Sequence, residues 1–99
     1  MTGTTRSSDG LDLRRRKLKF RSWHRGIREM DLIMGRFVDA CIDRLTDREL
    51  DQLEMLMEVS DPELFLWVTG QRPTPAAYDS NMLRQLRAFH LDATQPPDA

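Results

Sequence analysis

A regular spacing of apolar residues between positions 27 and 45 constrains the fold of this 99-residue chain more than any other feature. Apolar residues recur there at intervals of three and four, which is the period of one face of an α-helix. The positions between them are mostly charged. The spacing therefore predicts a long helix with one buried face, formed by Met30, Ile33, Met34, Phe37, Val38, Cys41, Ile42 and Leu45.

The chain on either side of this helix carries further helix-start and helix-stop signals. Segment 11–23 has a looser helical spacing, and Gly26 beyond it suits a helix end because glycine tolerates a left-handed backbone. Thr46 and Glu49 have the spacing of a capping box, in which each side chain bonds the backbone N–H of the other residue. That box predicts a helix whose inward face holds Leu50, Leu53, Leu56 and Met57.

A fourth helix is predicted to begin near Ser60 and to stop at Gly70. Its first turn has two readings. Either Ser60 caps the helix together with Glu63, or Asp61 caps it with Pro62 at the first helical position. Both readings place the helix start within a residue of the same point.

Three large apolar residues follow in that helix and cannot all face one core. We expect Phe65 inside and either Trp67 or Leu66 partly exposed. Core packing and partner contact suit Trp67 equally well. A last helix starts at Thr74 or Ser80 and turns one face inward, formed by Met82, Leu83, Leu86, Phe89 and His90.

The predicted fold is all-α, a small five-helix bundle. The helical domain covers 11–91, and we expect disorder in 1–10, which is rich in Thr, Ser and Gly, and in the tail 92–99. No apolar run approaches the roughly 18 residues of a membrane span, and segment 1–10 lacks the apolar stretch of a secretory signal. The single cysteine, Cys41, excludes an intrachain disulfide and suits a reducing compartment. We expect a monomer that does not bind membranes.

Opposite charges gather in two parts of the chain, although its net charge is only −1. Between 11 and 28, eight basic residues stand against one acid, and between 39 and 63, nine acids stand against two arginines. The bases from Arg14 to Arg21, with Phe20 and Trp23 nearby, would suit phosphate contacts in a nucleic acid. The acidic part would repel a duplex, so a solvated helix face explains most of these bases better.

The sequence carries no catalytic motif that we recognise. It lacks a nucleophile elbow, a phosphate-binding loop and a dinucleotide fingerprint. Cys41 lies on the apolar stripe, so we interpret it as a small buried hydrophobe. His24 stands among cations without an orienting acid, and Glu29 and Asp31 are two residues apart, so they point in different directions on a helix. We therefore predict that the protein is not an enzyme and binds no metal.

The stretch 25–31, called the corner below, places four charged side chains and one glycine in seven residues beside a probable chain turn. Arg25 and Arg28 flank Gly26, which lets another backbone approach closely, and arginine forms two-pronged bonds to carboxylates or carbonyls. Glu29 and Asp31 lie in the first turn of the predicted helix, where the helix dipole favours acids. Each feature alone also fits an ordinary helix end. Together they predict a surface that docks onto another protein.

The corner resembles a family signature. Its sequence fits the R-G-x-x-E-x-D pattern of the succinate dehydrogenase assembly factors that promote flavin attachment, and residues 61–67 resemble the D-P-[DE]-L-F-x-W pattern of the same family. The order and spacing of the two patterns agree, and the similarity runs from about Leu18 to Phe89. His24 and Ser60 stand where other members can carry a second Arg and a second Asp, which bears on the outer contacts only.

The resemblance implies a five-helix fold and a chaperone-like role. Members of the family bind the flavoprotein subunit of succinate dehydrogenase, and in some bacteria that of fumarate reductase, and favour covalent bonding of FAD to a histidine there. On this chain the resemblance implies main contacts from Arg25, Gly26 and Glu29, supported by Arg28 and Asp31. It also implies that the factor binds no cofactor itself but acts on FAD attachment in its client.

Secondary contacts are expected from Arg21, His24 and Trp67. Mitochondrial relatives carry a targeting extension, for which this N-terminus looks too short, so we expect the bacterial cytoplasm as the location. Two alternatives stay open at this point. One is a small helical nucleic-acid-binding protein that uses the bases from Arg14 to Arg21, and the other is a helical adaptor for an unrelated partner.

Overall fold

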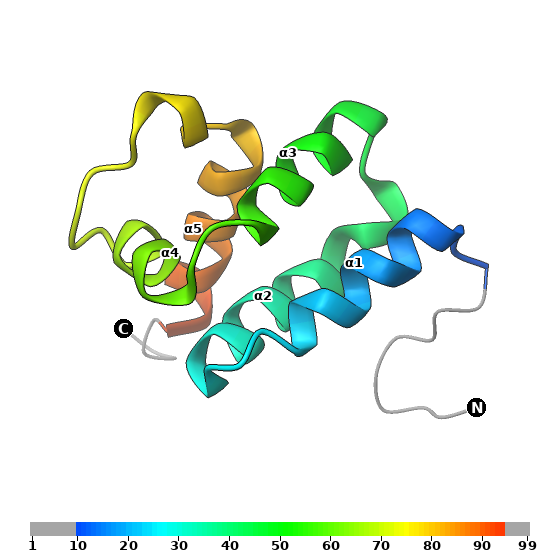
Figure 1. Ribbon diagram of the computed structural model, residues 1–99, viewed down its shortest axis with the longest axis horizontal. Coiled ribbons are helices and arrows are strands. Elements are labelled where there is room, and N and C mark those ends of the chain that lie inside the picture. The colour runs from blue at the N-terminus through cyan, green and yellow to red at the C-terminus, as the bar shows by residue number, and fades with distance from the viewer. Residues whose placement is uncertain (1–9, 95–99) are drawn as a thin grey trace.

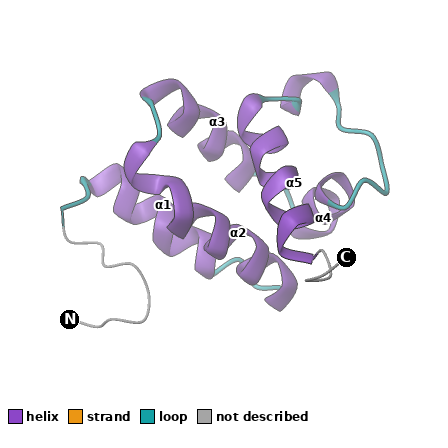
Figure 2. Ribbon diagram, turned by 180° about the vertical axis from the view of Figure 1, so that it is seen from behind, coloured by secondary structure: helices purple, strands orange, loops and turns teal. Residues whose placement is uncertain are grey.

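The computed structural model describes residues 10–94, and every regular element within that range is helical (Figure 1 and Figure 2). Five α-helices alternate with two short 3-10 helices, labelled η. The all-α, five-helix prediction is confirmed. The elements are α1 Leu13–Trp23, α2 Arg28–Cys41, η1 Ile42–Arg44, α3 Asp47–Met57, α4 Asp61–Val68, η2 Ala76–Tyr78 and α5 Asn81–Thr94.

Two predicted boundaries differ from the structure. The helix predicted over 27–45 is α2, and it ends at Cys41, whose φ of −128° interrupts the α-helix before η1 forms the last turn. Helix α5 continues to Thr94, so the tail predicted from 92 onward begins within a helix. Segment 1–9, where disorder was predicted, and the residues after Thr94 lie outside the described residues.

Helices α1 and α2 form an antiparallel hairpin across which the other helices pack (Figure 1). Helix α3 lies against α1 and α5, and α5 lies against α2 and α4. The enclosed core is apolar. Of the stripe that predicted α2, only Ile33 stays partly exposed, and the inward residues predicted for α3 are all buried.

Side-chain caps start three of the helices, and at the start of α1 the Asp12 carboxylate accepts the Arg15 N–H at 2.8 Å. The Glu49 N–H donates to Thr46 Oγ1 at 3.1 Å and the Thr46 N–H donates to Glu49 Oε1 at 3.0 Å, so the predicted capping box forms. Ser80 rather than Thr74 starts α5, because its Oγ accepts the Leu83 N–H at 3.2 Å. These caps satisfy backbone donors that a helix start would otherwise leave open.

Helix α4 begins and ends differently. Ser60 occupies the N-cap position without a side-chain bond, and the Asp61 carboxylate bonds another part of the chain, so neither predicted cap forms. The helix ends at Val68, and Gly70, two residues beyond it, takes a φ of +78°. The N–H groups of Gly70 and of the residue after it bond back to the carbonyls of Trp67 and Leu66, which closes the last turn.

The aromatic residues of α4 pack differently from the prediction. Trp67 is 3% exposed and lies 5.2 Å from Tyr78 between ring centroids, whereas Phe65 stays partly exposed. The prediction that Phe65 lies inside is therefore wrong, because Phe65 packs on the core but stays partly exposed. The prediction that either Trp67 or Leu66 is partly exposed is confirmed, and the exposed residue is Leu66. The reason is helical geometry, because α4 turns its 64, 67 and 68 positions to the core.

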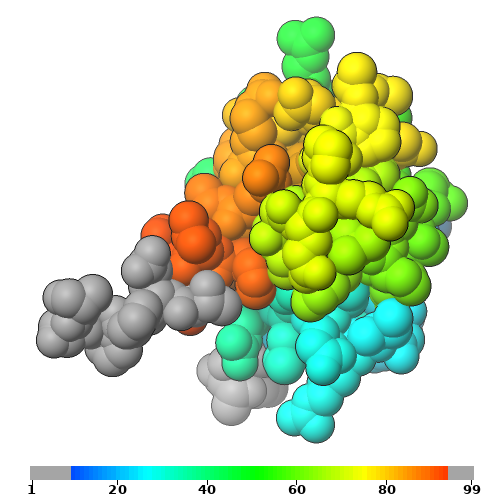
Figure 3. All heavy atoms as spheres, turned by 90° about the vertical axis from the view of Figure 1, so that its left-hand side faces the viewer, coloured from blue at the N-terminus to red at the C-terminus, as the bar shows by residue number. Residues whose placement is uncertain are grey.

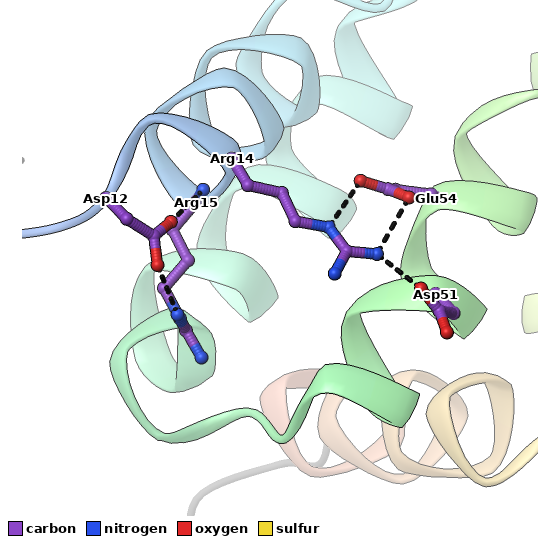
Figure 4. Close-up of polar contacts among 5 residues, drawn as sticks. All are labelled: Asp12, Arg14, Arg15, Asp51 and Glu54. Carbon is purple, nitrogen blue, oxygen red and sulfur yellow. Dashed lines mark hydrogen bonds and ion pairs between the residues drawn. The ribbon is translucent and has the colours of Figure 1, made fainter.

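A row of ion pairs joins α1 to α3 (Figure 4). The Arg14 guanidinium donates to the Glu54 carboxylate at 2.7 and 2.9 Å and to Asp51 at 2.5 Å. Arg21 pairs with Glu58 at 2.8 Å further along the same two helices. Part of the charge in the basic segment is therefore paired with the acidic part of the sequence within the fold.

Gly35 of α2 permits the close packing of α1, because a Cβ at this position would overlap the indole ring of Trp23. We expect Gly35→Ala to lower the free energy of unfolding by about 1 to 2 kcal/mol, since overpacking outweighs the gain of about 1 kcal/mol in helix propensity. In a Trp23→Ala background the same change should instead stabilise the protein. Urea denaturation of the four proteins measures both effects, and equal signs in the two backgrounds would contradict the packing.

The Arg14–Glu54 pair makes stability depend on pH. Hydrogen bonds from Arg14 lower the pKa of the Glu54 carboxyl from its ordinary value of 4.5. A lowered folded-state pKa stabilises the fold above about pH 4.5, and this contribution is lost as the pH falls through the folded-state pKa. Glu54→Gln should therefore lose less unfolding free energy between pH 6 and pH 3 than the unaltered chain. Asp47→Asn serves as the control, because Asp47 is exposed and has no ion-pair partner within residues 10–94.

Candidate partner-binding site

The corner begins where α1 ends and the chain turns back into α2. His24 leaves helical geometry with φ −131° and ψ 50°, and Gly26 takes a φ of +111°, which residues with a Cβ rarely adopt. Ile27 is extended at the N-cap position of α2 and makes no side-chain capping bond. The turn itself thus requires glycine at 26, and the space beside it is open, because nothing lies within 4 Å of an added Cβ.

The Arg25 side chain ties this turn to the connection between α3 and α4. Its Nε donates to the Asp61 carboxylate, its Nη1 donates to the Met57 carbonyl at 3.2 Å, and its Nη2 donates to the Val59 carbonyl at 2.5 Å. The side chains of Arg25 and Asp61 are only 7% and 8% exposed. We call this set of bonds the Arg25 clamp. It pairs the buried charge and occupies the guanidinium donors, which a buried ion pair requires.

The Arg25 clamp gives Arg25 a role that the sequence did not indicate. Its guanidinium is buried and bonded within the molecule, so Arg25 positions the corner. The contact with a partner that the resemblance implies for Arg25 stays a prediction. The sequence held one signal of this pairing, since Arg25 opens the first of the two family-like patterns and Asp61 opens the second.

Asp31 also acts within the molecule. Its Oδ1 accepts the backbone N–H of Arg25 at 2.6 Å, and its side chain is partly buried. The bond spans the turn and fixes the backbone of the corner from the α2 side. Asp31 therefore supports the corner rather than facing a partner.

The residues that the corner presents to solvent are 26–29. Gly26, Ile27, Arg28 and Glu29 are all exposed, with Ile27 at 39%. Neither Arg28 nor Glu29 has an ion-pair partner within residues 10–94. An exposed apolar side chain and bare backbone, followed directly by these two opposite charges, make a surface suited to binding another protein.

Of the three residues predicted to make secondary contacts, two are exposed and one is buried. His24 is exposed and stacks on Phe20 at 4.0 Å between ring centroids. Arg21 is exposed as well, although it pairs with Glu58. Trp67 lies in the core, so of the two roles that the sequence left open for it, the structure favours core packing.

The basic segment of α1 is largely engaged within the fold. Arg15, for example, donates to the carbonyls of Ile42 and Leu45 at 2.9 and 2.5 Å. Nucleic-acid binding depends on cations that are free to meet phosphates. Four bases of this segment have internal partners instead, which disfavours the nucleic-acid alternative; they are Arg14, Arg15, Lys19 and Arg21.

Cys41 is a buried thiol at the end of α2. Burial raises the pKa of the Cys41 thiol to about 11, so it stays protonated at neutral pH. Within residues 10–94, no group of three His, Cys, Asp or Glu side chains is placed to hold a metal ion. Across the same residues, no helix has the length and apolar character needed to cross a membrane.

Comparisons with known proteins identify a matching family and several similar proteins. A family described as "flavinator of succinate dehydrogenase" matches residues 16–90. The FAD assembly factor SdhE of Acetobacter pasteurianus is 44% identical over 80 residues, which cover 81% of this chain and 73% of that protein. No solved structure matches the chain.

Two mitochondrial proteins are more distant relatives. Succinate dehydrogenase assembly factor 2-B of Drosophila ananassae is 30% identical over 84 residues, which cover 83% of this chain and 52% of that protein. Succinate dehydrogenase assembly factor 2 of Kluyveromyces lactis is 32% identical over 88 residues, which cover 85% and 54%. The chain thus spans about half the length of these mitochondrial relatives.

The Arg25 clamp predicts a large loss of stability when one partner is removed. Asp61→Asn leaves a buried guanidinium without its counter-charge, which typically costs about 3 to 5 kcal/mol. Urea denaturation followed by circular dichroism measures the loss. Asp79→Asn is the matched control, because its pair with Arg84 is more than half exposed and should cost under about 1 kcal/mol. Equal, small losses in the two variants would contradict the clamp.

Proposed function

Because the chain belongs to the family of flavinators of succinate dehydrogenase, we propose that it binds the flavoprotein subunit of that enzyme and promotes covalent attachment of FAD to it. The observation that carries this proposal is the geometry of the corner. Gly26, Arg28 and Glu29 are exposed, and both charges are unpaired within residues 10–94, while the Arg25 clamp holds the backbone beneath them. A rigid, charged surface of this kind binds with little ordering cost.

A binding protein can speed a reaction in its partner without supplying chemistry. Binding to one conformation of the flavoprotein shifts its population toward that conformation. If that conformation brings the attacking histidine to the flavin, attachment speeds up through positioning alone. The bond-forming chemistry then belongs to the flavoprotein and its FAD. In this proposal the chain acts as a chaperone rather than an enzyme and holds no FAD itself.

The proposal also covers the location of the protein in the cell, its oligomeric state and its clients. We assign it to the bacterial cytoplasm, a location supported by the similarity to the Acetobacter pasteurianus protein. It acts there as a monomer, and the flavoprotein of fumarate reductase is a second client in organisms that have one. Binding precedes the docking of the iron–sulfur subunit, as the resemblance to the family implies.

The corner gives the experiment that tests this function. Glu29→Gln removes one exposed charge and should weaken binding of the purified flavoprotein subunit about tenfold, the loss expected when one hot-spot contact is removed. It should also lower covalent FAD, measured as fluorescence of the denatured flavoprotein in a gel. Asp47→Asn, an exposed first-turn acid at the start of α3, should change neither quantity.

Gly26→Arg offers a second, steric test. The positive φ at 26 costs a residue with a Cβ about 1 to 2 kcal/mol, but the open space around it leaves room for the side chain. The variant should stay folded by circular dichroism and lose flavoprotein binding. Unchanged flavoprotein fluorescence in cells that lack the protein would overturn the proposed function.

A further inference from the structure

A groove opens beside the corner, between α2, α4 and α5. Phe65 of α4 and Phe89 of α5 line it opposite α2, and its volume is about 270 Å³. Figure 3 views the molecule from the side on which α4 and the end of α5 lie above the cyan turn between α1 and α2. The α2 wall consists of four residues spaced at three and four along one helical face, namely Glu29, Leu32, Ile33 and Arg36.

The lining of the groove is mainly apolar and partly open to solvent. Ile33, Phe65 and Phe89 pack on the core and are only partly buried, so further apolar surface is available to cover. Covering such surface is favourable by roughly 25 cal/mol per Å². The groove is smaller than the roughly 300 to 1,000 Å³ of sites that hold drug-sized ligands. It therefore suits one or two side chains of another protein better than a free cofactor.

Two opposite charges stand at the ends of this apolar wall. Glu29 and Arg36 are seven residues apart on α2, which places them about 10 Å apart along the helix axis. Both side chains are exposed, and neither has an ion-pair partner within residues 10–94. The groove thus runs from an acid, across an apolar wall, to a base.

We propose that this groove receives a segment of the flavoprotein that carries a basic, an apolar and an acidic residue in that order. The basic residue faces Glu29, the apolar side chain fills the groove against Leu32 and Phe89, and the acidic residue faces Arg36. This inference rests on the proposed function and identifies the part of the client that is recognised. Glu29 belongs to both the corner and the groove, so the two form one continuous surface.

The order of charges gives the groove a direction. A segment that enters in reverse would set its acid against Glu29 and its base against Arg36, and each like-charge contact opposes binding. The apolar contact alone would not distinguish the two orientations. The charges therefore set the orientation of the client, and the apolar contact supplies most of the affinity.

Ala93 allows the groove to be filled without altering the core or the corner. It is exposed on α5 and lines the groove. Ala93→Trp should weaken binding of the purified flavoprotein subunit, freed of its iron–sulfur subunit, about tenfold by calorimetry. Ala88→Trp is the matched control, since Ala88 is exposed on the same helix but lines a different cleft, and it should bind within twofold of the unaltered chain.

The charge at the far end of the groove gives an independent test. Arg36→Glu should weaken binding about tenfold and reduce its dependence on salt, because an attractive charge contact is lost. Arg48→Glu, which places the same charge change at the exposed start of α3, should leave the affinity unchanged. Circular dichroism of each variant confirms that the loss is not one of folding.

The outcomes separate this inference from the proposed function. If the unaltered chain binds the flavoprotein and Glu29→Gln weakens binding, but Ala93→Trp and Arg36→Glu do not, the groove proposal alone is overturned. If the unaltered chain does not bind, both proposals fall. Tighter binding after deletion of residues 95–99 would show that the chain's own C-terminus occupies the groove. A dimer that Ala93→Trp converts to monomer would assign the groove to a second copy.

Discussion

A guanidinium buried between two loops needs a counter-charge and an acceptor for its donors, and Arg25 finds both at one place. Asp61 supplies the charge, while the carbonyls of Met57 and Val59 accept from the two terminal nitrogens. These partners all lie at the end of α3 and the start of α4. The bonds therefore hold the α1–α2 turn at one position relative to the rest of the bundle. The binding surface has a defined shape because the Arg25 clamp sits beneath it.

The corner divides its seven residues between support and contact. Arg25 and Asp31 bond inward, and Met30 is fully buried, so the chain at these points belongs to the fold. The exposed residues between them are held in place by this support and by the turn at Gly26. A surface that is already ordered loses little conformational entropy on binding, which favours affinity from a small number of contacts. An ordered turn of this kind suits the proposed recognition of another protein through a short segment.

Many of the opposite charges in the sequence form ion pairs within the fold. Arg14 and Arg21 of α1 meet Asp51, Glu54 and Glu58 of α3, which lie close because the bundle brings the two helices together. The charges that stay unpaired within residues 10–94, among them Glu29 and Arg36, are available to orient a partner. The separation of basic and acidic residues along the sequence suggested a surface that steers a partner. In the folded protein, many of these charges instead form ion pairs between α1 and α3.

The sequence by itself determined the helices and the core, because helical period, capping boxes and glycine stops are local properties that need no knowledge of the fold. It also located the corner and the family to which the chain belongs. Only the tertiary structure decided which charges face inward. Arg25 and Asp61 are 36 residues apart, and Trp67 turned to the core while Phe65 stayed partly exposed. Which side chains face inward depends on which helices pack together and on how each helix is rotated about its axis. A local sequence pattern does not contain this information.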